Sequence, residues 1–474
     1  MRRHRRVFVT VLFLLCHAPV YSEDHFLHQD GDIRLASFFP IHKAGHNGEN
    51  CGEIQKEDGI QPLEAMLFTL DQINESDSLL PGITLGTVGV DSCDNPIRAA
   101  EKALPLLKGF MRRKVGFQAK NYCNNSPSQW DCGDNIVGII GPQTSAVSLE
   151  IGNLGRLMNV PLVSYLSTSV TLCQREKFPN FFRTVPSDKH QARAIVELLK
   201  RFRWNYASFV HSDSEYGTTG YQLVKQEIKK SKVICLADPI TIYNKQFDRD
   251  DYIRVVKTLL HGELLNESLE IKPFVKPKVV IVFADRVPAG KLLQAAKDLG
   301  VRDQLLWIGS DAWASRESVV ENREEYVEGA IAIQPLRRVL PKYNDYFETL
   351  IAKSNPRNPW FEEYLEAYHN CSNANKTYFA NCRGGSKFRQ QHYIHFVRDA
   401  VYAFAHALHN LHVDSCGGFE DRLCPQFKQR VFTDLISYLA NVSFKDTDEN
   451  FTFRFYGHND SYSQGSSPHD GPPR

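Results

Sequence analysis

Residues 137–154 read VGIIGPQTSAVSLEIGNL, and this stretch decides the fold. A short apolar run ends at Gly141-Pro142, a small polar cluster follows, and an amphipathic stretch begins at Ser145. This order is typical of a buried strand, a turn and a helix. Hydroxyl groups at a helix start either cap free backbone N–H groups or help to hold an anion such as a carboxylate. The stretch therefore predicts a strand–helix unit with a cap or an anion site at Ser145.

The same order of strand and helix recurs along the chain. Strands that alternate with helices of this length are typical of βαβ units and a parallel sheet. A chain of 474 residues is also too long for one hydrophobic core. We therefore predict an α/β protein that forms a bilobed clamshell of two doubly wound parallel-sheet lobes. The predicted strands lie at 83–90, 135–140, 160–166, 206–211, 279–284 and 305–310, and the predicted helices at 61–74, 96–111, 145–158, 189–202, 216–230, 289–299, 343–352, 360–369, 393–412 and 426–439.

The first lobe is expected to be discontinuous in sequence. It comprises residues 33–187 and a helix-rich return segment, 330–457, which crosses towards the second lobe at its end. Residues 188–329 form the second lobe between them. Residues 112–135 are polar and interrupt the rhythm, so they predict a long exposed loop.

Both ends of the chain are expected to lie outside the lobes. Residues 1–22 join a basic start, MRRHRR, to an apolar run that is too short to span a bilayer, which is typical of a secretion signal. Residues 458–474 are polar and rich in Gly, Pro and Ser, which predicts disorder. We expect a secreted chain, or the outer face of the plasma membrane if the chain is part of a longer receptor.

Charge and cysteine content exclude several kinds of protein. The 56 basic and 55 acidic residues give a net charge of +1, and removal of the four Arg of the signal leaves 52 against 55, or −3. This balance argues against nucleic acid or an anionic membrane as partner. Ten Cys remain after the signal and form no CxxC pair, which favours disulfides in a secreted protein. Eight glycosylation sequons, a mild excess, lie at Asn74, Asn124, Asn266, Asn370, Asn375, Asn441, Asn450 and Asn459.

Four polar loops follow predicted strands. They read GPQTSAV, SYLSTS, EYG and GSDAW. Ligands of such sheets bind in the crevice at the carboxyl ends of the strands. The loops therefore predict a small-molecule site between the lobes.

Eight stretches in residues 34–457 carry a family resemblance: CGEIQKEDGIQPLEAM (51–66), LPGITLGTVGVDSC (80–93), the opening stretch, VPLVSYLSTS (160–169), FFRTVPSDKHQARAIVELLKRFRWNYASFVHSDSEYGTTG (181–220), LLWIGSDAW (305–313), NPRNPWFEEYLEAYHNC (355–371) and AVYAFAHALHNLH (400–412). Together they resemble the ligand-binding (Venus flytrap) ectodomain of class C G-protein-coupled receptors, and most of all that of the metabotropic glutamate receptors. The resemblance implies a periplasmic-binding-protein-like clamshell that closes on an α-amino acid.

The matching pocket positions carry over one by one. The resemblance implies that Ser145 holds the ligand α-carboxylate and that Thr168 holds both the carboxylate and the ammonium. It implies that Asp188 and Asp311 face the ammonium and that the ring of Tyr216 covers it. Hydroxyls at a helix start suit an anion, and carboxylates beside an aromatic face suit an ammonium.

The distal part of the pocket departs from the glutamate receptors. Pro62, Asp58 and Tyr393 stand where the resemblance implies Arg, Tyr and Lys; Lys387 could replace that Lys only with a gap in the alignment. Arg316 alone matches a pocket-rim cation of the family. A distal carboxylate would then lose its charge partners. We therefore expect an L-α-amino acid other than glutamate, with Asp58 and Asp285 favouring a cationic or polar side chain, unless Asp58 is simply solvated.

Disulfides are implied by the same resemblance. It pairs Cys51 with Cys93, Cys371 with Cys382, and Cys416 with Cys424. Cys123 lies in the loop that bears an intersubunit bridge in the family, and Cys132 could pair with Cys173. Cys235 matches a Cys that joins a downstream cysteine-rich module absent from this chain, which would leave it unpaired.

Partners and rival functions follow from the same residues. The resemblance implies a homodimer, or a pair with a related subunit, through helices 96–111 and 145–158, whose apolar residues are Leu104, Leu107, Leu149, Ile151, Leu154 and Leu157. A G protein is a partner only of a full-length form with membrane helices. A secreted decoy or soluble amino-acid-binding protein is the alternative.

An enzyme is disfavoured because GxSxG, HExxH, P-loop and GxGxxG motifs are absent from the sequence and no nucleophile accompanies Asp188 and Asp311. His406, His409 and His412 have a spacing that could ligate zinc, but such helical His are more often structural. No metal and no cofactor is predicted.

Overall fold

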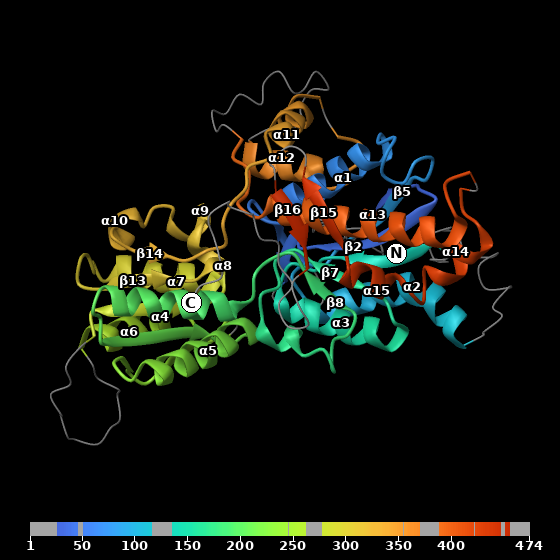
Figure 1. Ribbon diagram of the computed structural model, residues 1–474. Coiled ribbons are helices and arrows are strands. Elements are labelled where there is room, and N and C mark those ends of the chain that lie inside the picture. The colour runs from blue at the N-terminus through green and yellow to red at the C-terminus, as the bar shows by residue number, and fades with distance from the viewer. Residues whose placement is uncertain are drawn as a thin grey trace, which may run out of the picture.

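The computed structural model describes residues 26–45, 51–115, 135–244, 246–261, 277–353, 355–369, 388–420, 422–446 and 451–455. It contains two large, mainly parallel sheets, each covered by helices on both faces. Figure 1 shows these as two lobes, with β2, β5 and α13 in one and β13, α4 and α6 in the other. The bilobed α/β prediction is confirmed. The expected signal at 1–22 and tail at 458–474 lie outside the described residues.

The first sheet has the strand order β1-β5-β2-β6-β7-β8. Only the edge strand β1 runs antiparallel to its neighbour. Helices α1 and α13 belong to the core on one face, and α2 and α3 to the core on the other. The elements are β1 (Leu27–Gln29), β2 (Ile33–Phe39), α1 (Ile60–Asn74), β5 (Leu85–Asp91), α2 (Pro96–Val115), β6 (Ile136–Ile140), α3 (Ser145–Met158), β7 (Leu162–Ser164), a 3-10 turn (Val170–Cys173) and β8 (Phe181–Arg183).

The second sheet has the order β10-β9-β12-β13-β14, with β11 also paired to β9, and all its pairs are parallel. Helices α4 and α5 pack on one face, and α6 and α7 on the other. The last strand extends this sheet beyond residue 329. The elements are α4 (Asp188–Arg201), β9 (Tyr206–Ser212), α5 (Glu215–Ser231), β10 (Cys235–Leu236), β11 (Ile240–Ile242), α6 (Arg249–His261), β12 (Val279–Phe283), α7 (Arg286–Asp298), β13 (Leu306–Gly309) and β14 (Ile331–Ala332).

The chain then returns to the first lobe, where α13 packs against α1. The helix predicted over 426–439 is instead two helices, because turn residues that end in Thr433 and Asp434 separate them. The remaining elements are the hairpin β3 (His42–Ala44) and β4 (Cys51–Ile54), the short helices α8 (Asp311–Ala314), α9 (Glu317–Val320) and α10 (Glu324–Val327), then α11 (Pro341–Lys353), α12 (Phe361–His369), α13 (Ile394–Cys416), α14 (Pro425–Arg430), α15 (Leu435–Ala440), β15 (Ser443–Asp446) and β16 (Phe451–Arg454). No helix in the described part combines the length and the apolar character that a membrane crossing needs.

Two of the implied disulfides are present. Cys51 bonds to Cys93, and Cys416 bonds to Cys424. The pair Cys371–Cys382, together with Cys123 and Cys132, lies outside the described residues. Cys173 and Cys235 are free thiols, so the suggested bond from Cys132 to Cys173 is not formed.

The three histidines that could have bound zinc have separate structural partners. The ring of His406 stacks on Phe444 at 4.6 Å. The backbone N–H of Leu80 donates to His409 Nδ1 (3.1 Å), and a ring nitrogen of His412 lies 2.8 Å from the carbonyl oxygen of Arg422. These contacts point the rings at protein partners and not at a common ion.

Candidate functional site

A cleft lies between the two lobes, at the carboxyl ends of strands from both sheets. The cavity inside this cleft has a volume of about 120 Å³. Eight of the ten predicted site residues line it. They are Ser145, Thr168, Tyr216, Asp311, Asp58, Asp285, Arg316 and Tyr393.

Ser145 and Thr144 form the first-lobe wall of the cleft. Thr144 is the N-cap of α3, but its side chain makes no capping hydrogen bond and donates instead to Asp94 Oδ1 (2.9 Å). Ser145 Oγ accepts from the backbone N–H of Ser169 (3.1 Å), which ties the helix start to the loop that contains Thr168. Neither hydroxyl caps the helix, so the start of α3 keeps its N–H groups and its positive dipole end beside the cleft.

Asp188, which is buried, and Asp311, which is partly buried, form a pair of carboxyl groups in the second lobe. Gln191 Nε2 donates to Asp188 Oδ1 (3.1 Å) and to Asp311 Oδ1 (2.9 Å), and the Tyr216 hydroxyl donates to Asp311 Oδ1 (2.5 Å). Asp188 itself does not line the cleft, and its Oδ2 has no hydrogen-bond partner in the described part of the chain. Neither carboxyl makes an ion pair with any described residue.

This pair is poorly compensated by charge. Burial raises the pKa of Asp188 well above its usual range, and the neighbouring Asp311 raises it further. Burial also raises the pKa of Asp311, against the hydrogen bonds from Tyr216 and Gln191. Two carboxyl groups in this state would be stabilised in their charged form by a cation that enters the cleft.

The cleft is also lined by a dense ionic cluster around Asp58. This carboxylate is only 2% exposed and pairs with Arg286 and with Arg316 (Nη1 to Oδ1, 2.9 Å), both from the second lobe. Gln143 Nε2 (2.6 Å) and the Tyr393 hydroxyl (3.0 Å) also donate to it. Burial alone would raise the pKa of Asp58, but the two guanidinium groups hold it at about 2. Asp58 is therefore ionised, buried and already paired, so the alternative that it is simply solvated is wrong.

The structure changes two further expectations about the distal pocket and adds one residue. Pro62 lies buried in the first turn of α1 and does not line the cleft, because the helix turns it into the lobe core. Asp285 lines the cleft, but its Oδ2 accepts from Ser212 (2.7 Å) and Ser214 hydroxyls. Arg286 was not identified from the sequence, although its place directly after strand β12 is the position that marked the other loops.

The family follows from comparison with known proteins. The family described as receptor family ligand binding region matches residues 61–463. The chain belongs to this family. It is 33% identical over 438 residues to metabotropic glutamate receptor 8 of Homo sapiens, which covers 90% of this chain and 46% of that receptor. It is 33% identical over 427 residues to metabotropic glutamate receptor 4 of Mus musculus, covering 88% and 45%. The resemblance to class C receptor ligand-binding domains is therefore confirmed, and this receptor ligand-binding region spans about half the length of the curated relatives it matches.

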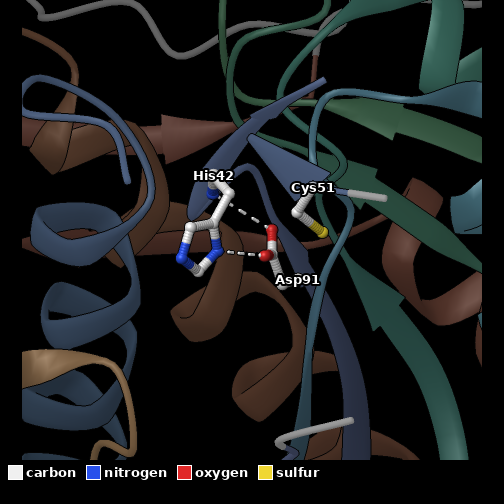
Figure 2. A group of neighbouring side chains, drawn as sticks. All are labelled: His42, Cys51 and Asp91. Carbon is white, nitrogen blue, oxygen red and sulfur yellow. Dashed lines mark hydrogen bonds and ion pairs between the residues drawn. The ribbon is translucent and has the colours of Figure 1, made fainter. Parts of the chain in front are cut away.

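A second cluster, His42, Cys51 and Asp91, has the ligand types of a metal site but a structural role. Figure 2 shows His42 Nδ1 against Asp91 Oδ2, a distance of 2.6 Å. Cys51 is oxidised to a disulfide and offers no thiolate, and His42 Nε2 lies 3.2 Å from Glu363. Burial lowers the pKa of His42, but Asp91 and Glu363 outweigh it and raise the pKa to about 9. The charged ring thus joins the β3–β4 hairpin to α12.

Proposed function

We propose that the cleft binds an L-α-amino acid and that lobe closure around this ligand is the functional response. The observation that carries the proposal is that Asp311, which Gln191 links to the buried Asp188, and Ser145 at the uncapped start of α3 line the same cleft. An α-amino acid has an ammonium and a carboxylate on one carbon atom. It would therefore complement an acidic wall and a helix start at the same time.

In this proposal the two groups of the ligand divide between the lobes. The α-carboxylate binds the Ser145 and Thr168 hydroxyls and the N–H groups at the start of α3. The ammonium binds Asp311, with Asp188 behind it as a second negative charge. The Tyr216 ring covers the ammonium while its hydroxyl keeps Asp311 in place.

The distal cluster supports a ligand other than glutamate. A distal carboxylate would have to compete with Asp58 for Arg286 and Arg316, and it would lie near Asp285 as well. A cationic side chain would meet the same two guanidinium groups. Amide and hydroxyl groups from Gln55, Gln143, Ser315 and Gln334 also line the cleft. We therefore favour a polar, uncharged side chain.

Contacts between the lobes support closure as the response. Arg316 Nη1 donates to the carbonyl oxygen of Glu57 (2.8 Å), and the Ser318 N–H donates to Glu57 Oε1 (3.2 Å). Thr171 Oγ1 donates to Glu215 Oε1 (2.5 Å) on the other side of the cleft. A ligand that contacts both lobes would shift the population towards this closed arrangement.

A dimer is the second part of the proposal. Helices α2 and α3 lie side by side, and Leu104 and Leu157 are 43% and 62% exposed on them, while Leu107 and Ile151 are buried in the lobe. An exposed apolar pair on adjacent helices suits a two-fold interface. Acting outside the cell in such a dimer, the region would pass closure to a G protein only in a longer form with membrane helices.

The test is a thermal-shift screen of the secreted chain against all natural L-amino acids, with Ser145→Ala/Thr168→Ala as control. A ligand at about a hundredfold over its Kd should stabilise the fold by about 2.7 kcal/mol. A shift with one polar amino acid, lost in the double variant, supports the proposal. A larger shift with glutamate contradicts the specificity, and no shift with any amino acid favours a decoy that binds no such ligand.

A further inference from the structure

Two short basic stretches of the second lobe have the same pattern. They read LKRFRW (199–204) and IKKSKV (228–233), and neither contains an acidic residue. In each, two cations, one uncharged residue and one cation stand between apolar residues. We call their six cations, all exposed, the basic edge: Lys200, Arg201, Arg203, Lys229, Lys230 and Lys232. The nearly neutral net charge of the whole chain gives no sign of this local concentration of positive charge.

The fold places the two stretches next to each other and in register. Helices α4 and α5, which end in these stretches, pack side by side on one face of the sheet. The strands that follow, β9 and β10, pair in parallel with Tyr206 opposite Cys235. Arg203 and Lys232 each lie three residues before these paired positions, and the N–H of Cys235 donates to the carbonyl oxygen of Asn205 (2.8 Å). Equivalent cations of the two stretches therefore lie at the same end of the sheet, next to the starts of β9 and β10.

Helix capping does not account for this arrangement. Cations in the last turn of a helix do complement its dipole. However, α6 and α7 on the other face carry only one basic residue each in that turn, His261 and Lys297. Arg203 and Lys232 also adopt left-handed backbone conformations, with φ of 57° and 55°. Asn or Gly adopts these more readily at a helix end, so a long cationic side chain at both positions needs another explanation.

Most of the charge of the basic edge is uncompensated. Lys200 pairs with Glu197 (2.7 Å) and Lys230 pairs with Glu227. The other four cations make no ion pair with any residue in the described ranges. Phe202 lies between them, half-exposed, and its ring stacks on Trp204 with centroids 4.6 Å apart. An exposed flat ring beside free cations can contact the apolar face of a sugar ring while the cations bind its charged groups.

We propose that the basic edge binds a sulfated polysaccharide chain. Sulfate groups repeat along such a chain, so one chain can reach both stretches, and Arg and Lys side chains bind such anions strongly. A nucleic acid would call for more aromatic platforms than the single Phe202–Trp204 stack. An anionic membrane would call for a broader apolar surface than the half-exposed Phe202 ring and the exposed Val233 side chain. The secretion signal expected at residues 1–22 also suits a polyanion found outside the cell.

The test is binding of the secreted chain to immobilised heparin across a salt series. The informative variant is Arg203→Asn/Lys232→Asn, because Asn suits the left-handed backbone and should not lower the melting temperature. The matched control is Arg254→Gln/Lys257→Gln, which removes two exposed cations of α6 on the opposite face of the same sheet. We expect the edge variant to bind about tenfold or more weakly at about 0.15 M salt, with a log–log salt slope smaller by about two.

Three results would overturn the proposal. The first is equal weakening by the control, which would mean attraction by total charge alone. The second is no binding of the unaltered chain at about 0.15 M salt. The third is binding to phosphatidylserine vesicles or single-stranded DNA as tight as to heparin. None of these readouts depends on an amino-acid ligand, so the two proposals succeed or fail separately.

Discussion

Replacing Asp58 by Asn should turn the cleft towards acidic amino acids. In the unaltered chain this carboxylate occupies both Arg286 and Arg316. Asn keeps the shape but removes the charge, which leaves two guanidinium groups at the distal end. A charged hydrogen bond contributes about 1.5–3 kcal/mol. A ligand carboxylate that takes over one such bond should therefore gain roughly tenfold to a hundredfold in affinity over the corresponding amide.

The assay is calorimetric titration of both proteins with glutamine and glutamate. The measured quantity is the ratio of the two Kd values within each protein, which cancels any change in overall stability. Such a change is expected, because removing one partner of a buried ion pair costs about 3–5 kcal/mol. Asp285→Asn is the matched control: it removes a negative charge from the same cleft, but that carboxylate is held by Ser212 and Ser214 and not by arginine.

Three outcomes would refute this reasoning. The ratio could stay unchanged in Asp58→Asn, which would mean that the arginines do not face the ligand side chain. Asp285→Asn could give the same gain, so that net charge and not pairing sets specificity. The unaltered chain could already prefer glutamate, in which case Asp58 does not exclude a distal carboxylate.

Three other predictions follow from buried groups and exposed side chains. Because burial raises the pKa of Asp188 and Asp311, amino-acid affinity should fall as the pH is lowered from about 8 to about 5, and titrations of Asp311→Asn should lack most of this dependence. The pKa of His42 is raised to about 9, so the charged ring contributes its full stability to the fold below about pH 6.5 and loses it as the pH rises through 9. The melting temperature should therefore fall over that range in the unaltered chain and stay level in His42→Gln. Leu104→Glu on the exposed face of α2 should halve the mass measured by light scattering if α2 and α3 form a dimer interface, and leave ligand binding intact.

Local sequence patterns predicted most of the fold. Helix α3 has the bounds that its periodicity gave, because an amphipathic helix after a turn is specified within its own residues. Strand β2 was missed although it lies near the centre of the first sheet, since Arg34 and Ser37 interrupt its apolar run. In the structure Ser37 is buried and bonds to Thr87 (3.0 Å), a partner 50 residues away that no local pattern reveals.

The sequence predicted those site residues that lie in a single loop after a strand. Residues at strand ends, such as Ser145 and Asp311, line the cleft as the loops indicated. What the sequence could not reveal is pairing across the lobes: Arg286 reaches Asp58 over a separation of 228 residues. For that reason Asp58, which the sequence suggested as a free acid, is an ionised carboxylate paired with two arginines in the structure.

Asp58 and the Asp188–Asp311 pair therefore have different roles, because their charge is compensated from different sources. Asp58 obtains two from the second lobe, so its charge is used in holding the lobes together and its pKa lies at about 2. Asp188 and Asp311 make no ion pair with the described residues, and burial outweighs the charge of Arg183 near Asp188, so the pKa values of both carboxyl groups rise. Carboxyl groups whose environments give them different pKa values can take different roles in one site. If the missing cation is the ligand ammonium, the cleft selects α-amino acids as a class through Asp311, and selection within the class is left to the hydrogen-bonding groups around the distal cluster.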